Sequence, residues 1–303
     1  MSVVFEQVLI LFIFALTGFV LCKSKLVNAD KTQLLSTLEV YVFLPCVAFN
    51  TFSQRFTVAY LQEKYPVLLI SLCLLILLVI GSKLLAHIMV KDSYQRLVYR
   101  YSLTIPNYGY IGYALAQSVF GSDTLLDMMI FTLPMAVYTH SAGYAMLTNR
   151  NSGKELLKKV LNPTIIATFL GAIVGITGLT VPGLLTDAVQ KAAACMSPIS
   201  MLLIGMVISQ YNLKELISHK PAYLISALRL VLIPAAAFAL LKLTHLDLAI
   251  APAILTYAMP CGANTIVFAK ITGQDCKTGA SFTLISTVLS LITIPLCIHF
   301  FIG

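Results

Sequence analysis

The stretch that decides the fold is TIPNYGYIG, residues Thr104–Gly112, inside an apolar segment that runs from Leu97 to Phe120. A helix crossing a lipid bilayer must satisfy its backbone hydrogen bonds internally, because hydrocarbon offers no substitute partner. Pro106 removes one backbone donor and clashes with the carbonyl of Ser102, four residues earlier. It also pushes Ile105 away from helical geometry. We therefore expect a break in the middle of this segment.

The composition of the whole chain places it in a membrane. Of 303 residues, 59% are hydrophobic and only 11% are charged, and the mean hydropathy is +0.91. A soluble domain carries roughly 25% charged residues, so this chain has too little polar surface to face water. Long apolar runs without alternation exclude a barrel of strands. The composition predicts an all-α integral protein of the cell membrane.

Segment lengths predict how often the chain crosses the bilayer. A hydrocarbon core of ~30 Å needs about 20 helical residues at ~1.5 Å each. The first candidate has no Lys or Arg before it and contains Glu6, so we interpret it as a span and not as a signal peptide. We predict ten transmembrane helices: Val3–Cys22, Leu34–Phe52, Pro66–Val90, Leu97–Phe120, Thr124–Leu147, Thr164–Gly178, Leu185–Ser209, Pro221–Leu241, Leu248–Lys270 and Thr278–Phe301.

The basic residues explain the net charge of +8 without a polyanionic partner. Loops that follow odd-numbered spans and their borders hold most of them: Lys23, Lys25, Lys31, Lys91, Arg96, Arg150, Lys154, Lys158, Lys159, Lys214, Lys220, Lys270 and Lys277. Loops that follow even-numbered spans hold Arg55, Lys64 and Lys242. Lys and Arg accumulate on the cytoplasmic side of membrane proteins. This pattern predicts that both termini are external, and it gives no reason to expect a nucleic acid as partner.

The sequence also argues against enzyme and metal chemistry. Its seven cysteines form no CxxC pair and no Cys/His cluster, so we expect no disulfide framework, no metal site and no cofactor. An intramembrane enzyme needs paired acids, a Ser/His pair or a metal cluster at membrane depth. Only scattered single acids occur in the predicted spans.

The order of the spans predicts a duplication. Residues 1–147 hold five spans, residues 148–163 form a basic cytoplasmic linker, and residues 164–303 hold five more. An odd number of spans in each half inserts the second half upside down relative to the first, as in inverted repeats. Proline positions agree with this, since corresponding spans of the two halves share them: Pro45 with Pro198, and Pro106 with Pro260.

The two central breaks predict a binding site. At ~1.5 Å per residue, Pro106 and Pro260 both reach the middle of a ~30 Å core, so the fourth and ninth spans would cross there as broken helices. Each half-helix after a proline presents free N–H groups and a partial positive charge. Asn107 and Asn264 add amide groups at the same depth, and Gly109 and Gly262 permit close approach. This combination suits a small organic anion, especially a carboxylate. The alternative is that the prolines only kink packed helices.

Several stretches in both halves carry a family resemblance. They are EVYVFLPCVAFNTF, NPTIIATFLGAIVGITGLTVPGLL, MSPISMLLIGMVIS, LRLVLIPAAAF and PCGANTIVFAKITGQDCKTGASFTLISTVLSLITIP. In order and spacing the chain resembles the auxin efflux carrier family, within the bile, arsenite and riboflavin transporter superfamily. That family includes plant PIN-type auxin exporters and PIN-like bacterial carriers for compounds such as malonate and malate. The long cytoplasmic loop of many plant members is absent, which weakens an inference of auxin as substrate.

The resemblance implies an architecture and a set of site residues. Helices one, two, six and seven would form a scaffold, often the contact of a homodimer, and helices three to five and eight to ten a mobile transport part. Substrate would bind beside the crossing of helices four and nine, with wall residues from helix two. Carried over by position, the implied site residues are Pro106, Asn107, Tyr108, Pro260, Gly262 and Asn264, with Pro45 and Asn50 on the wall.

Three further polar residues in predicted spans are functional candidates, because charge inside a membrane is costly. Arg229 lies deep in the eighth span, where it could act near substrate or coupling, or bind a structural partner such as a carbonyl or Glu39. Glu39 could be a proton site or an interfacial acid. His140 could carry a proton, or could be a hydrogen-bonded packing residue.

Taken together, these features predict a secondary transporter for a small organic anion, such as malonate, malate or an auxin-like acid. It would work by alternating access of the crossover elevator type. A passive anion channel remains a second hypothesis and an intramembrane enzyme a third.

Overall fold

The computed structural model describes residues 2–28, 32–149 and 152–302, and every named element in these ranges is a helix. The predicted all-helical class is confirmed. Lys31 and Arg150, which entered the charge pattern, lie outside the described residues, as do residues 150–151 of the predicted linker.

The helices before the linker overlap the predicted spans. Two of the predicted spans correspond to single helices, α1 (Ser2–Lys23) and α4 (Val58–Met89). The others are built from consecutive pieces: α2 (Thr32–Leu38), η2 (Glu39–Phe43) and α3 (Leu44–Arg55); α5 (Ser93–Thr104), η3 (Tyr108–Gly112), α6 (Tyr113–Leu115) and η4 (Ala116–Phe120); α7 (Ser122–Tyr138), η5 (Thr139–Gly143) and α8 (Tyr144–Thr148).

The elements from the linker onward repeat this mixture of whole and divided helices. They are α9 (Gly153–Val160), α10 (Pro163–Thr177), α11 (Gly183–Ser209), α12 (Leu213–Ile217), α13 (Pro221–Ala227), η6 (Leu228–Leu232), α14 (Ile233–Leu243), η7 (Asp247–Ala249), α15 (Ile250–Tyr257), α16 (Asn264–Thr272) and α17 (Lys277–Phe301).

Six helices in the described ranges are long and apolar enough to cross a membrane: Val3–Lys23, Thr32–Arg55, Val58–Met89, Gly183–Ser209, Pro221–Leu243 and Lys277–Phe301. Shorter apolar helices occupy Pro163–Thr177 and Asp247–Tyr257. The predicted third span begins too late. Helix α4 starts at Val58, where the Thr57 side chain accepts a hydrogen bond from the backbone of Tyr60, and Pro66 lies inside it. Proline does not mark a helix start where a better cap precedes it.

Two glycines end the helices that follow the central breaks. Gly121 has φ 85° and Gly273 has φ 67°, a left-handed region that glycine adopts without steric cost. Gly121 closes the run from Tyr108 to Phe120, and Gly273 follows α16. In both halves, the helix after the break therefore ends at a glycine with a positive φ angle.

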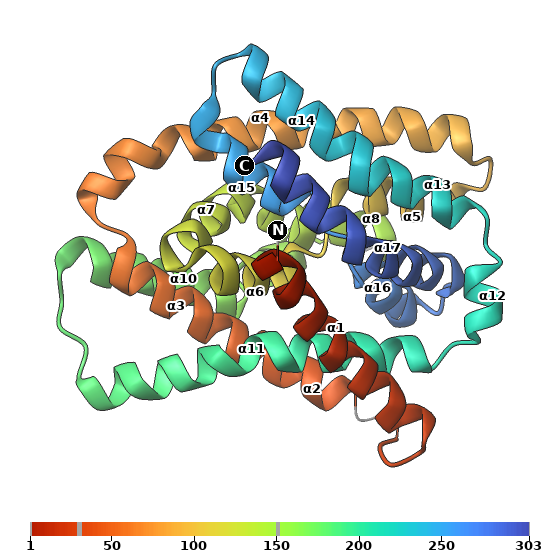
Figure 1. Ribbon diagram of the computed structural model, residues 1–303, viewed down its shortest axis with the longest axis horizontal. Coiled ribbons are helices and arrows are strands. Elements are labelled where there is room, and N and C mark those ends of the chain that lie inside the picture. Colours follow the sequence, from red (N-terminus) through yellow and green to blue (C-terminus); the bar gives the residue numbers. More distant parts are fainter. Residues whose placement is uncertain (1, 29–31, 150–151, 303) are drawn as a thin grey trace.

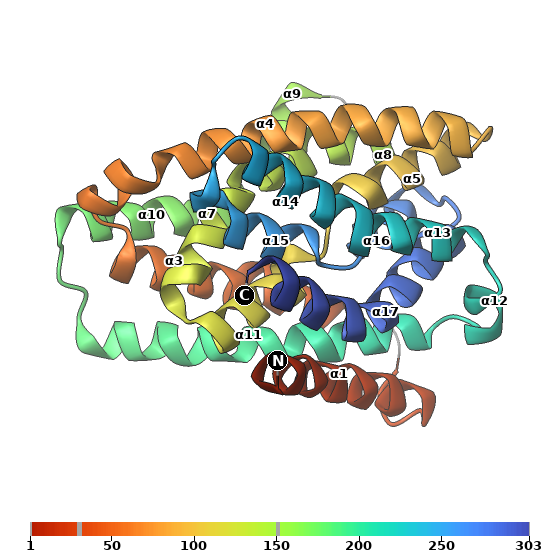
Figure 2. The same ribbon diagram turned by 45° about the horizontal axis from the view of Figure 1, so that its top comes forward.

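Small residues bring two pairs of helices into close contact. Helix α1 packs on α11, and α10 packs on α3. A side chain at Gly205 of α11 would collide with the carbonyl of Ala15 in α1, and one at Gly175 of α10 would collide with the carbonyl of Phe52 in α3. Figure 2 shows α1 beside α11 at the lower side of the molecule, and Figure 1 shows that α1 crosses α11 at an angle.

The broken helices lie inside this frame. Figure 2 shows α4 along one edge and α11 along the opposite edge, with α15 between them. Helix α5 packs on α4, and α15 packs on α7 and α17. The helix ends beside the interruptions are fully buried. Examples are Tyr101, Leu103, Ile254 and Met259. The interruptions at the prolines are therefore enclosed by protein.

Candidate functional site

Both predicted breaks occur, and they meet. Helix α5 ends at Thr104, and the chain is helical again from Tyr108. Helix α15 ends at Tyr257, and the chain is helical again from Asn264. Between them, Pro106 and Cys261 form an isolated antiparallel bridge. We call this pair of non-helical segments, residues 105–107 and 258–263, the crossing.

Hydrogen bonds between the two segments hold the crossing together. The backbone N–H of Asn107 donates to the carbonyl of Pro260 at 2.7 Å, and that of Gly262 donates to the carbonyl of Ile105 at 3.4 Å. The N–H of Cys261 donates to the hydroxyl of Ser286 at 3.0 Å. Backbone groups that lose their helical partners thus find new ones, which non-helical backbone at membrane depth requires.

A cavity of about 160 Å³ adjoins the crossing. Its lining includes six of the predicted site residues and one predicted coupling residue: Pro106, Asn107, Tyr108, Gly109, Gly262, Asn264 and His140. We call it the crossing cavity. Pro260 does not line it and acts through its carbonyl.

The two asparagines differ in their partners. The side chain of Asn264 donates to the hydroxyl of Tyr101 at 2.9 Å. Asn107 is only 5% exposed, yet its side-chain nitrogen has no hydrogen-bond partner. A buried amide donor without a partner costs about 1–3 kcal/mol. Because Asn107 lines the crossing cavity, this unmet hydrogen-bonding capacity lies beside the cavity.

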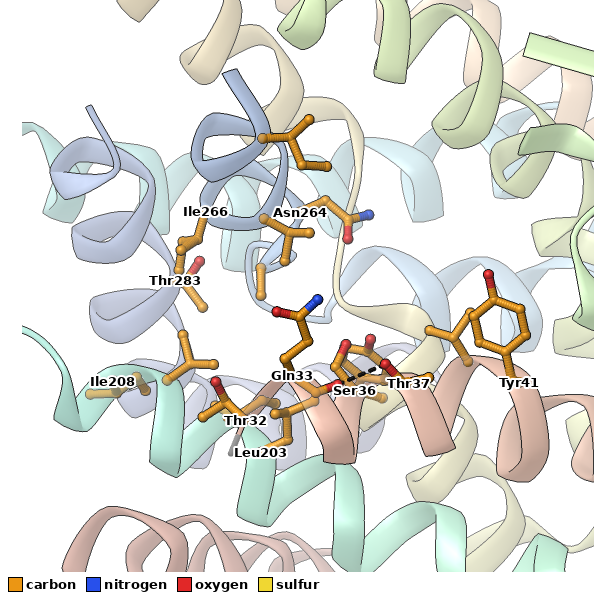
Figure 3. A pocket seen from close by; sticks show the side chains of 17 residues that line it. Thr32, Gln33, Ser36, Thr37, Tyr41, Leu203, Ile208, Asn264, Ile266 and Thr283 are labelled. Atoms are coloured by element: carbon orange, nitrogen blue, oxygen red, sulfur yellow. Dashed lines mark hydrogen bonds between the residues drawn. The ribbon is translucent and has the colours of Figure 1, made fainter. Parts of the chain in front are cut away.

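A larger cavity of about 370 Å³ meets the crossing cavity at Asn264, which lines both. Figure 3 shows Gln33 from α2 and Asn264 from the start of α16 on facing sides of it. Ser36 and Thr37 continue the polar face of α2, and Thr37 donates to the carbonyl of Gln33 at 2.8 Å. The sequence prediction missed this face because it began the second span at Leu34. Polar residues at i, i+3 and i+4 were the available signal.

The two predicted wall residues lie elsewhere. Asn50 lines a separate cavity of about 270 Å³, and its side-chain oxygen accepts a hydrogen bond from Gln54 at 2.8 Å. Pro45 lines none of these three cavities. Val40 and Leu44 form this wall of the crossing cavity. The π turn η2 lies between α2 and α3, and its wider turn changes which residues face inward.

The structure assigns partners to the two charged candidates. Arg229 is 0% exposed; its Nε donates to the carbonyl of Met259 at 3.3 Å and its Nη1 to that of Leu103 at 3.1 Å. Of the partners left open for Arg229, the structure therefore selects carbonyls and not Glu39. Glu39 is also fully buried and accepts a hydrogen bond from Ser200.

A shared local geometry links these candidates. Glu39, Tyr108, His140 and Arg229 all lie in π-helical segments, which are η2, η3, η5 and η6. Single π turns inside α-helices occur frequently at functional sites. Within the described residues, no group of three or more His, Cys, Asp or Glu side chains could hold a metal ion.

Comparison with known proteins identifies the family of the chain. A family model described as "Membrane transport protein" matches residues 3–157 and 150–298. An uncharacterized transporter of Methanocaldococcus jannaschii is 25% identical over 301 residues, covering 96% of each chain. An uncharacterized transporter of Methanothermobacter thermautotrophicus is 23% identical over 300 residues, again covering 96% of each. The chain belongs to this family of membrane transport proteins and is not an enzyme, which confirms the resemblance described above.

Proposed function

We propose that this membrane transport protein is a secondary carrier for a small organic anion that binds in the crossing cavity. One observation carries the proposal: Asn107, whose buried side-chain nitrogen has no hydrogen-bond partner, lines a cavity beside two helix starts. A carboxylate oxygen is the natural acceptor for such a donor.

The local electrostatics favour an anion. Two helical runs, Tyr108–Phe120 and Asn264–Thr272, begin at the cavity. Helix starts carry unpaired N–H groups and about half a positive charge. Pockets for drug-sized ligands measure about 300–1,000 Å³, so a cavity of about 160 Å³ suits a small carboxylate such as malonate or malate.

The proposed architecture is ten spans in two inverted five-helix repeats, joined by the linker. The two close helix pairs support it. Helix α1 packs on α11, and α10 packs on α3, which are predicted spans one with seven and six with two. An inverted repeat relates span one to span six and span two to span seven, so it relates these two pairs to each other. These four spans would form the scaffold, with the other six as the transport part. We further propose that both termini are external in the cell membrane, that the transport part moves as an elevator, and that copies pair through the scaffold.

Reconstitution in liposomes tests the function. Malonate, malate and indole-3-acetate are offered separately, with and without a pH gradient. We expect saturable uptake of at least one of them and faster exchange when unlabelled substrate is inside. Flux that never saturates and shows no counter-transport would favour a passive anion channel. The absence of flux for every carboxylate would overturn the proposal of an anion carrier.

A further inference from the structure

The two breaks leave particular carbonyls without their helical partners. In an unbroken helix the N–H of Asn107 would donate to the carbonyl of Leu103, four residues earlier, but it donates to Pro260 instead. The carbonyl of Met259 would likewise pair with residue 263, but the chain there is not helical. Both carbonyls lie at the end of a half-helix, where the backbone carries partial negative charge.

Arg229 binds both of these carbonyls. Its Nε donates to Met259 and its Nη1 to Leu103, which lie on opposite halves of the chain. The planar guanidinium has several donors in a rigid fork and can serve two acceptors at once. Its Cζ also lies 5.9 Å from the centre of the Tyr257 ring, within the range of a cation–π contact.

The charge of Arg229 is not cancelled by an acid. Among the ion pairs of the described residues, none includes Arg229, and its Nη2 has no hydrogen-bond partner. Arg229 does not line the crossing cavity, so it does not contact a solute there. Its full positive charge instead offsets the two negative helix ends, which leaves the field of the two positive helix starts unopposed.

We propose that Arg229 is a positioning residue that joins the carbonyl ends of the two broken helices and makes the crossing selective for anions. The joining is independent of any substrate. The selectivity rests on the proposed anion carrier. The two parts are therefore tested by separate measurements.

Hydrogen–deuterium exchange of the purified protein tests the joining. Arg229→Met removes both hydrogen bonds, and we expect backbone exchange in peptides covering residues 103–109 and 258–264 to rise about tenfold, the factor that corresponds to losing roughly 1.4 kcal/mol. The matched control is Arg55→Met, which removes an exposed arginine that pairs with Asp123; exchange at the crossing stays as in the wild type.

The outcome of this measurement decides the first part. Wild-type exchange at the crossing in Arg229→Met would overturn it. If Arg229→Met does not fold, Arg229→Gln is measured in its place, because glutamine is too short to reach both carbonyls. Wild-type hydrogen–deuterium exchange at the crossing in Arg229→Gln would also overturn the joining.

Uptake kinetics test the selectivity, with malate as the probe. Arg229→Lys keeps the charge, and we expect its KM for malate to stay within about threefold of the wild type. Arg229→Gln keeps a donor but loses the charge, and we expect its KM to rise about tenfold. Equal KM values in the two variants would overturn the selectivity, since a purely structural role does not depend on charge.

A wild-type protein that takes up no malate would contradict malate as substrate in the proposed function. The same pair of variants is then compared on whichever panel carboxylate is transported. The exchange measurement does not depend on that result.

Discussion

Asn107 acts at the crossing through two separate groups. Its backbone N–H donates to the carbonyl of Pro260, while its side chain belongs to the lining of the crossing cavity and has a buried nitrogen without a hydrogen-bond partner. The backbone bond survives any substitution except proline. Changing the side chain therefore alters the proposed binding site without removing a hydrogen bond of the protein itself.

We expect Asn107→Ala to abolish saturable carboxylate uptake and to leave the thermal unfolding temperature unchanged. A hydrogen bond to a charged group contributes about 1.5–3 kcal/mol, so affinity falls by roughly 10- to 150-fold and saturation is lost over the wild-type substrate range. Uptake into proteoliposomes and thermal unfolding in detergent measure the two effects. Asn50→Ala, in a separate cavity, is the matched control. Asn107→Ala with wild-type uptake would remove the proposed site.

Asn264→Ala should also abolish uptake, but its effect has two parts. This side chain donates to the hydroxyl of Tyr101, and Tyr101 is completely buried. Removing the donor leaves that hydroxyl with one partner fewer, so we expect a lower unfolding temperature as well as lost transport. An unchanged unfolding temperature would contradict a structural contribution from this bond.

Residues of the crossing could be predicted because they are exceptional in an apolar span. A proline followed by asparagine and glycine has few explanations at membrane depth, and Asn107 and Asn264 were found in this way. Partners could not be predicted. Ser200 lies 161 positions from Glu39, and Leu103 lies 126 positions from Arg229. Such pairs depend on how helices pack, which periodicity along one chain does not contain.

At the scale of elements, the contact of α1 with α11 depends on the absence of side chains. Gly18 of α1 faces the backbone of Leu202, and Gly205 of α11 faces the backbone of Ala15. Small residues at helix interfaces allow the close approach by which membrane helices associate. The geometry leaves no space for a β-carbon at either position.

We expect Gly205→Val to destabilise the protein by about 1–3 kcal/mol or more, the usual cost of overpacking. Gly81→Val in α4 is the matched control, since a β-carbon there meets nothing within 4 Å. Thermal unfolding followed by circular dichroism compares the two variants. Equal unfolding temperatures would contradict the close contact of α1 with α11.

The positions of most helices could be predicted from sequence, but their internal geometry could not. Length and hydropathy locate a helix, whereas a π turn changes neither. The missed turn at Glu39–Phe43 explains why Leu44, and not the predicted Pro45, lines the crossing cavity. A proline in a predicted span also does not always mark a break. Helix α11 continues through Pro198 without one.

At the scale of the whole molecule, the two halves contribute one partner each to the crossing. Pro106 comes from the first and Cys261 from the second, and Arg229 in the second half binds a carbonyl in the first. The proposed inverted topology predicts an antiparallel meeting of these two segments. The contacts that form the proposed site therefore also support the proposed topology.

This topology makes a prediction about exposed loops. Ser24 follows the first predicted span and Thr244 follows the eighth predicted span, and both residues are exposed. The positive-inside pattern places Ser24 in the cytoplasm and Thr244 outside. We expect a membrane-impermeant maleimide to label Thr244→Cys in intact cells, and Ser24→Cys only after permeabilisation. The background for both is a variant that keeps only the buried Cys261 and Cys297, which itself stays unlabelled. Labelling of Ser24→Cys in intact cells, with Thr244→Cys protected, would reverse the orientation. Labelling of both in intact cells would contradict an odd number of crossings between them, and with it the inverted halves.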